Sequence, residues 1–278
     1  MALITVSRGS MSGGEALAKC VSERLEYPLV GREILVEAAS KLGVPEDTLR
    51  QKLEKSPGMW GRLVSNRRLY IIAVQATLAE HAADGNLVYH GHAGHLLLRN
   101  IPAVLRVRLI APLEMRVRTL MDRQQMSRDA ATEYIQNVDA DRVRWTKFIY
   151  GMDWSDPSLY DLVINLEKMS LDTACSLIRE GVSRPEFAAS AETRKVLADF
   201  RLACRVRVAL ATNVETRNIE LDIRALDGVV EISGDVPTAG VLVHATSARP
   251  EAAIVRIAQE VTGVQKVLLN IRKIDAYH

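Results

Sequence analysis

The sequence predicts an α/β fold, in which a mostly parallel sheet is covered by helices on both faces, followed by a small α+β domain. Two patterns support this prediction. From residue 2 to residue 180, apolar runs of strand length alternate with segments of helical periodicity, as in a parallel sheet with crossover helices. After a small, polar stretch at 182–199, the pattern changes to helix, strand, strand, helix, strand. The 278 residues suffice for two such domains.

The first predicted strand, residues 2–6, breaks into a turn rich in Gly and Ser, which leads into a helix over 15–25. Leu17, Val21 and Leu25 repeat at helical spacing, so this helix buries one face. Small residues before a helix let backbone N–H groups converge on an anion, and the helix dipole favours negative charge. The turn therefore predicts a phosphate site. A plain strand-to-helix turn is the alternative, because such turns are also rich in Gly and Ser.

This turn departs from the common P-loop pattern G-x-x-x-x-G-K-[ST], which supplies a Lys for the terminal phosphates and a hydroxyl for magnesium. With Gly13 as the second glycine, Arg8 stands at the first glycine and Gly14 at the Lys. Glu15 stands at the hydroxyl position. Arg8 is the only cation near the turn, so we expect it to replace part of the function of the missing Lys.

The rest of the first domain follows in order. We expect an extended piece at 27–30, helices at 34–42, 45–55, 67–83 and 171–180, and strands at 86–89, 103–110 and 159–165. Gly43 and Gly181 end two of these helices, and Ser170 caps the start of another. The strands are short and apolar, which is typical of a buried parallel sheet.

Three histidines, His90, His92 and His95, follow the strand at 86–89. Their spacing places them on no common helix face, and neither Cys nor a carboxylate lies among them, so we predict no metal site. A Gly-rich turn at the carboxyl end of a strand is the favoured interpretation, because ligands of open α/β sheets bind at that edge. His92 is then a candidate contact for a phosphate.

Positive charge accumulates between residues 99 and 150, where ten Lys and Arg stand against six Asp and Glu. Guanidinium groups bind phosphate oxygens with two hydrogen bonds. The candidates for closing over a polyphosphate are Arg116, Arg123, Arg142 and Arg144. The alternative is a solvated helical face, in which Asp139 and Asp141 pair with two of these arginines at i, i+3 spacing.

The C-terminal part, from about residue 200, is predicted to be a small α+β domain. We expect helices at 202–211 and 249–262 and strands at 219–223, 229–236 and 264–274, with a turn at Asp227 and Gly228. This part contains no pair of nucleophile and base. We therefore expect it to make contacts rather than to perform chemistry.

Composition excludes several classes of protein. Binding of nucleic acid usually requires excess positive charge and aromatic side chains that stack on bases. The net charge is only +2 and the aromatic content only 5%, so no nucleic acid is expected as partner. No apolar run is long enough to span a membrane. Three widely spaced cysteines, Cys20, Cys175 and Cys204, indicate reduced thiols, and we expect no leader sequence and a cytoplasmic location.

Four segments together resemble the cytidylate kinase-like family of P-loop proteins, over about residues 2–180: 4–25, 31–35, 111–117 and 153–165. The most specific parts are Ser7-Arg8 with Ser12-Gly13-Gly14, and the block Asp153-Trp154 to Tyr160-Asp161-Leu162-Val163-Ile164-Asn165. Residues 228–234 with 263–267 look like a BON domain, a module associated with binding lipid or partner surfaces.

The resemblance implies a P-loop NTPase-type domain at 1–181, a linker at 182–199 and a BON-like domain at 200–278. The implied phosphate loop consists of Arg8, Gly9, Ser10, Met11, Ser12, Gly13, Gly14 and Glu15. Arg32 would lie near the acceptor nucleotide, and residues 116–144 would form a lid. The family usually has Gly at Met11, an acidic residue at Gly31, and Gly-Arg-Gly at Gly91-His92-Ala93.

The function implied is phosphoryl transfer from ATP, with Mg²⁺, to a nucleoside monophosphate such as CMP. Such transfer depends on positioning and on cations that meet the developing charge. The alternative is a nucleotide sensor of little or no activity, whose BON-like tail binds a protein partner or a membrane surface. A weaker third hypothesis is a nucleic-acid binder. Association with a second copy of the chain is left open.

Overall fold

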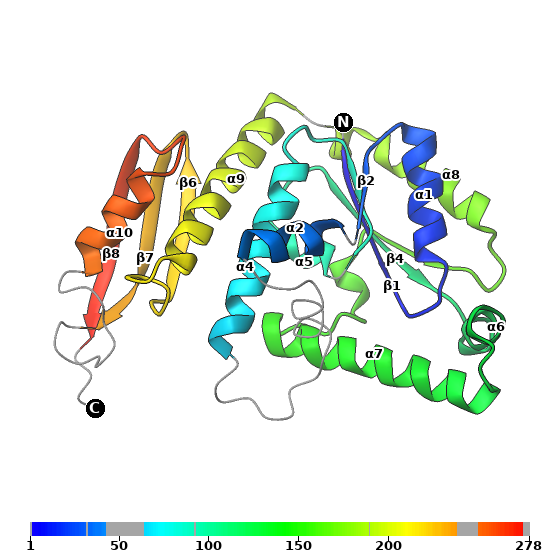
Figure 1. The fold of residues 1–278 in the computed structure, drawn as a ribbon. Helices are drawn as coiled ribbons and strands as arrows, with labels where there is room; N and C mark the ends of the chain where they lie inside the picture. Colours follow the sequence, from blue (N-terminus) through cyan, green and yellow to red (C-terminus); the bar gives the residue numbers. More distant parts are fainter. Residues whose placement is uncertain are drawn as a thin grey trace.

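The computed structural model describes residues 2–31, 33–42, 64–91, 93–188, 190–237 and 250–274. Within them, an α/β domain carries the N-terminus and a smaller α+β domain lies beside it (Figure 1). The expected helix at 45–55 lies outside the described residues.

The α/β domain is built on a five-stranded sheet with the order β2-β3-β1-β4-β5. All four neighbouring pairs are parallel, which confirms the predicted sheet. The strands are β1 (Leu3–Arg8), β2 (Leu29–Val30), β3 (Leu87–Tyr89), β4 (Val104–Ile110) and β5 (Leu162–Asn165). Because β1 is central, its carboxyl end, where the Gly-rich turn begins, lies in the middle of one sheet edge.

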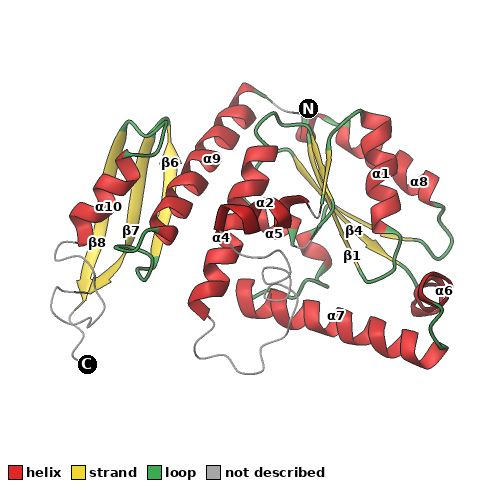
Figure 2. Ribbon diagram, in the orientation of Figure 1, coloured by secondary structure: helices red, strands yellow, loops and turns green. Residues whose placement is uncertain are grey.

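Helices cover both faces of this sheet, as Figure 2 shows. One face carries α1 (Gly14–Leu25) and α8 (Leu171–Val182), and the other carries α2 (Glu33–Leu42), α4 (Val64–His81) and α5 (Gly94–Leu97). The alternation of side chains along β1 produces the two layers: Ile4 and Val6 pack towards α1, while Leu3 packs towards α2 and α4. All three side chains are buried.

Two further helices, α6 (Leu113–Gln124) and α7 (Arg128–Tyr150), follow β4, and α7 runs along the carboxyl end of the sheet (Figure 1). Ser127 caps α7 by accepting a hydrogen bond from the backbone N–H of Ala130. The two helices bury a small apolar cluster of their own, which includes Val117 and Leu120. A short 3-10 helix, η1 (Pro157–Leu159), precedes β5.

Residues 182–199, the expected linker, contain the short helix η2 (Pro185–Phe187) and the first turns of α9 (Ala191–Thr212), a helix that we expected to begin only at residue 202. The reason is a capping box. The Ser190 side chain accepts from the backbone N–H of Thr193, and the Thr193 side chain accepts from the backbone N–H of Ser190. This cap starts α9 well before the apolar spacing that made the helix visible in the sequence.

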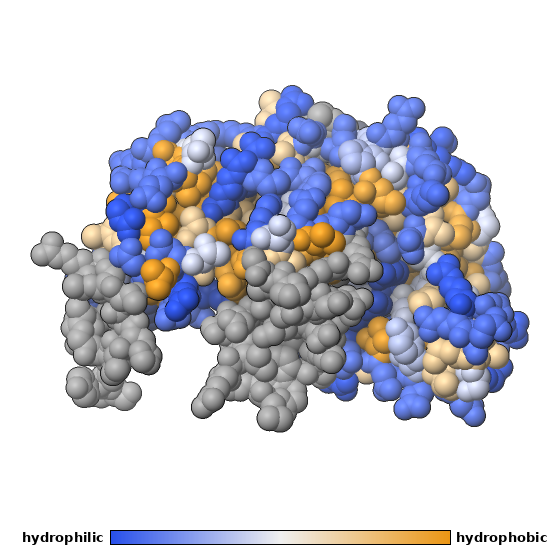
Figure 3. Space-filling model, viewed as in Figure 1, coloured by the Kyte–Doolittle hydropathy of each residue, from blue (hydrophilic) through white to orange (hydrophobic). Residues whose placement is uncertain are grey.

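The smaller domain continues with β6 (Leu221–Leu226), β7 (Val229–Pro237), α10 (Pro250–Gln259) and β8 (Lys266–Ile274), in the predicted order. The sheet order is β6-β7-β8, with β6 antiparallel and β8 parallel to β7. Its core lies between this sheet and the helices α9 and α10. Figure 3 shows hydrophobic residues (orange) among hydrophilic ones (blue) on the surface of this domain.

α9 fastens the two domains to each other by packing along α4. The contact is apolar where Ala76 and Ala79 meet Cys204, and ionic where both carboxylate oxygens of Glu80 accept from Arg205, at 2.6 and 2.8 Å. None of the described helices combines the length and the apolar character needed to cross a bilayer.

Candidate phosphate site

The Gly-rich turn is a closed loop between β1 and α1. The backbone carbonyl of Gly9 accepts two hydrogen bonds from Ser12, one from its N–H at 3.4 Å and one from its hydroxyl at 2.8 Å. Gly13, the residue before α1, has φ of 79°, and Met11 has φ of 58°. Left-handed backbone at these two residues turns the chain from the strand into the helix within a few residues.

Two glycines allow arginine side chains to lie directly against this loop. A Cβ atom at Gly14 would lie 2.4 Å from Cδ of Arg8, and one at Gly9 would lie 2.8 Å from Nη1 of Arg116. At either position, a side chain larger than that of glycine would require the neighbouring arginine side chain to move. Gly14, which stands where a P-loop has its Lys, therefore makes room for the side chain of Arg8.

Asp139 of α7 connects the loop to the helices above it. Its Oδ1 accepts from the backbone N–H of Ser10 at 2.9 Å, and its Oδ2 is paired with the guanidinium of Arg116. Arg142 lies 3.9 Å from the same carboxylate and donates to the backbone carbonyl of Arg8 at 3.1 Å. The loop, α6 and α7 thus meet at one group of charges.

This group of charges is partly shielded from solvent, since the side chain of Arg116 is 12% exposed and that of Asp139 is 25% exposed. Nε of Arg116 is buried and has no hydrogen-bond partner among the described residues. Buried donors are normally paired. An incoming anionic oxygen could satisfy this donor while two arginines balance its charge.

His90, at the end of β3, is a neutral group beside these cations. Burial, together with the nearby charges of Arg8 and Arg142, lowers the pKa of His90 to about 3. Its Nε2 is buried and has no hydrogen-bond partner within the described part of the chain. The imidazole can therefore accept or donate one hydrogen bond without adding charge at neutral pH.

The remaining predicted site residues lie elsewhere. Arg144 is exposed and pairs with Asp141 at 2.6 Å, and Arg123 is exposed in the last turn of α6. In the described residues neither arginine contacts the loop. Arg32 and His92 lie outside the described residues. Glu15 is exposed in the first turn of α1, while Ser10 and Ser12 are buried.

The block at 153–165 holds the sheet edge beside the site. The Tyr160 hydroxyl donates to the Trp154 carbonyl at 2.8 Å, and Arg108 of β4 donates to the same carbonyl at 2.9 Å. His95 contacts Tyr160 and shares a hydrogen bond of 2.9 Å with the hydroxyl of Ser7. Burial lowers the pKa of His95 to about 3. We interpret these contacts as structural support for β1.

Sequence analysis missed Asp139 and His90 as site residues. Asp139 was considered only as a surface partner of Arg142, because spacing along a helix does not reveal what lies across from it. Its position one helical turn from a candidate phosphate-binding arginine was the available signal. His90 was visible only as one of three histidines.

Comparisons with known proteins give a consistent assignment. A sequence model of the family described as "Cytidylate kinase-like family" matches residues 3–168. The cytidylate kinase of Staphylothermus marinus is 30% identical over 115 residues, which are 41% of this chain and 63% of that protein. The cytidylate kinase of Pyrococcus horikoshii is 26% identical over 195 residues, which are 69% of this chain and 94% of that protein.

Among solved structures, an uncharacterized protein from Eubacterium ventriosum has a similar fold. The TM-score is 0.52 at 20% sequence identity, and the match covers 66% of this chain and 99% of that one. At this identity the likeness concerns the fold alone.

Proposed function

Because this chain belongs to the cytidylate kinase-like family, we propose that its α/β domain is a nucleoside monophosphate kinase, which transfers a phosphoryl group from ATP to CMP or dCMP. The relatives named cytidylate kinase support the choice of pyrimidine monophosphate. The proposed kinase domain comprises residues 1–181, and the proposed BON-like domain comprises residues 200–278. We propose that the protein is located in the cytoplasm.

The observation that carries this proposal is the carboxylate of Asp139 on the loop. This carboxylate accepts a hydrogen bond from the backbone N–H of Ser10 and lies beside Arg116 and Arg142. Phosphate oxygens have the same charge and the same preference for such donors. A loop amide that is bound by a carboxylate in this way is suited to a phosphate.

We propose the following roles for the residues. The loop amides and Arg8 hold the phosphates of the donor, Arg116 supplies its unpaired Nε to a transferring oxygen, and Arg142 neutralises charge that develops during transfer. His90 faces the acceptor as a neutral hydrogen-bonding group. We also propose, from the sequence alone, that Arg32 and His92 contact the acceptor nucleotide.

The residues present suit ATP better than they suit an independent metal ion. In the described ranges no group of three or more His, Cys, Asp and Glu could hold a metal, and the hydroxyl of Ser12 already donates to Gly9. Mg²⁺ would therefore rest mainly on the phosphates of ATP, and the hydroxyl of Ser10 would be the candidate ligand from the loop. Bound Mg²⁺ would supply charge neutralisation of the phosphates.

A coupled assay of ADP release tests the proposal, with ATP, Mg²⁺ and CMP, dCMP, UMP or AMP as acceptors. The proposal predicts acceptor-dependent turnover, highest with CMP or dCMP, that is lost in Arg8→Ala. Turnover that is equal with and without an acceptor would contradict it.

The second candidate function is a nucleotide-responsive binding protein, in which the C-terminal domain carries the signal. The ionic and apolar contact of α9 with α4 favours it, because this contact joins the C-terminal domain to the α/β domain. Leu226 and Leu268 are exposed on the C-terminal sheet and are candidates for the surface that meets a partner or a membrane. A rise in melting temperature with ATP or CMP, without turnover, would favour this function.

A further inference from the structure

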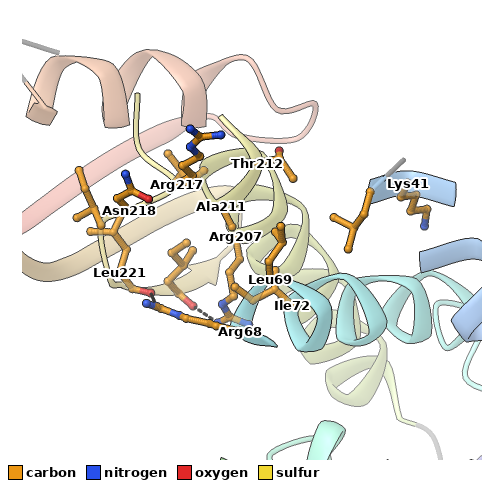
Figure 4. A pocket seen from close by; sticks show the side chains of 14 residues that line it. Lys41, Arg68, Leu69, Ile72, Arg207, Ala211, Thr212, Arg217, Asn218 and Leu221 are labelled. Carbon is orange, nitrogen blue, oxygen red and sulfur yellow. Dashed lines mark hydrogen bonds between the residues drawn. The ribbon is translucent and has the colours of Figure 1, made fainter. Parts of the chain in front are cut away.

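A pocket lies between the two domains, away from the phosphate loop. It has a volume of about 520 Å³, which is within the usual range for sites of small organic ligands. The residues that line it come from the end of α2, from α4, from the end of α9, and from the chain that leads into β6 (Figure 4). Pockets between domains are frequent ligand sites.

The described charged residues that line this pocket are all cations. The residues that line it include Lys41, Arg68, Arg207 and Arg217, and no Asp or Glu is among the described residues of the lining. Lys41 and Arg217 are exposed, whereas Arg68 and Arg207 are half-buried. A concave surface with four cations and no lining carboxylate attracts anions.

One of the two half-buried guanidinium groups, that of Arg207, has only neutral hydrogen-bond partners in the described part of the chain. Arg207 donates to the side-chain oxygen of Gln75 at 2.9 Å and to the backbone carbonyl of Ile223 at 3.1 Å, and both acceptors are neutral. Arg207 forms no ion pair with a described carboxylate. Each guanidinium has five N–H donors, so further donors are available to a ligand.

Arg68 and Arg207 lie next to each other along β6, as Figure 4 shows. Arg68 donates to the carbonyl of Leu221 at 3.1 Å and Arg207 to that of Ile223, two residues further along the same strand. Carbonyls two residues apart on a strand are about 7 Å from each other. Two guanidinium groups that bind neighbouring carbonyls of one strand can share a single anion, and Arg207 has no described carboxylate partner of its own.

Carboxylates near the pocket already have partners. Glu220 pairs with Arg68 at 3.0 Å from an exposed position, with 84% of its side chain exposed. In the adjoining hollow, Asp235 pairs with Arg272 at 2.6 Å. Glu220 thus offsets part of the charge of Arg68. The remaining lining cations, Lys41, Arg207 and Arg217, form no ion pair with a described carboxylate, so an excess of positive charge remains in the pocket.

The other walls of the pocket are apolar. They include Leu69, Ile72, Leu210 and Ile219, and Figure 4 shows Leu69 and Ile72 next to Arg68 and Arg207. We propose that this pocket is a binding site for an amphipathic organic anion, with its carboxylate, sulfonate or phosphate on the arginines and its planar apolar body against these aliphatic side chains. Such a ligand would contact both domains at once. The proposal is independent of the kinase activity.

The test uses 8-anilinonaphthalene-1-sulfonate, which has a sulfonate on a planar apolar body. Fluorescence titration of the full chain should show one saturable site. Arg217→Glu and Lys41→Glu should each weaken binding by about tenfold or more, since each replaces a cation of the pocket lining by a carboxylate, which repels the sulfonate. Both side chains are exposed, so these variants should fold. Displacement of the dye by CMP or by 2-naphthoate tells whether a phosphate ester or a carboxylate is preferred.

Two controls locate the dye. Arg179→Glu changes an exposed arginine of α8, which does not line the pocket, and should leave binding unchanged. Arg8→Ala removes a cation of the phosphate loop, away from this pocket, and should also leave dye binding unchanged. Absence of saturable binding would overturn the proposal. Equal binding by Arg217→Glu, Lys41→Glu and the wild type would overturn it too, and so would loss of dye binding in Arg8→Ala.

Discussion

The carboxylate of Asp139 accepts a hydrogen bond of 2.9 Å from the backbone N–H of Ser10, across 129 positions of sequence. The same carboxylate is paired with Arg116 and lies 3.9 Å from Arg142. A phosphate that bound this amide would have to replace the carboxylate, because both are anions that need the same donors. Asp139 therefore competes with a phosphate for the backbone N–H of Ser10.

Asp139→Ala should consequently strengthen the binding of ATP or inorganic phosphate by about tenfold, which corresponds to the loss of one competing charge-assisted hydrogen bond. Isothermal titration calorimetry measures the change. Asp141→Ala is the matched control, because Asp141 pairs with Arg144 away from the loop. Weaker binding by Asp139→Ala would mean that the carboxylate instead positions the arginines for the nucleotide.

The arginines of the predicted lid should differ in importance. Arg116→Ala and Arg142→Ala should lower kcat by about a hundredfold, the usual effect of removing one electrostatic contact in a transition state. Arg123→Ala and Arg144→Ala should cost less than about fivefold, because these exposed side chains make no described contact with the loop. Steady-state kinetics with ATP and CMP separates the two groups. Equal losses in all four variants would show that the lid rearranges to bring every arginine to the phosphates.

Met11 offers a test of the loop backbone. Its φ of 58° is in the left-handed region, and its side chain packs against the apolar cluster of α6 and α7. A residue other than glycine is strained at this φ. Met11→Ala removes the side-chain packing but keeps this backbone strain, whereas Met11→Gly removes both. The Gly variant should therefore be more stable than the Ala variant by about 1 kcal/mol in urea unfolding. An Ala variant of equal or greater stability would contradict the assigned conformation.

Acid should destabilise the fold through His90 and His95. Burial lowers the pKa of each to about 3. Below pH 6.5 the unfolded chain takes up protons that the native chain does not, so the free energy of unfolding falls as pH falls from about 6.5 towards 3. Each histidine contributes at most about 1.4 kcal/mol per pH unit.

His95→Gln removes one of these two titrating groups and keeps a side chain that can form hydrogen bonds. The loss of unfolding free energy between pH 7 and pH 5 should be smaller in this variant than in the wild type, as measured by urea unfolding at both pH values. An identical pH dependence of the variant and the wild type would show that His95 is protonated in the native state.

The order of strands and helices could be predicted from local patterns. The alternation of apolar runs and helical spacing is a property of neighbouring residues, and both the parallel sheet and the order of the C-terminal elements followed from it. The start of α9 was misplaced because a capping box at Ser190 begins the helix in a segment without apolar spacing.

The site was less predictable because it depends on contacts between distant segments. Arg8, Arg116 and Arg142 were all candidates from the sequence, but only the path of α7 across the sheet edge reveals that Asp139 meets Ser10. Two departures from the family pattern also gain a physical meaning. Met11 and Ala93 stand where the family usually has Gly, and both have positive φ, 58° and 54°. The chain thus keeps a glycine-like backbone at these positions without glycine.

The central claim is that the loop from Arg8 to Gly14 binds phosphate at the start of α1. A crystal structure of the full chain with ATP and Mg²⁺ tests it most directly. We predict that the phosphates lie on the loop amides, with Arg8 and Arg116 in contact with them and Asp139 moved away from the N–H of Ser10. A nucleotide bound elsewhere, with Asp139 still hydrogen-bonded to Ser10, would contradict the claim.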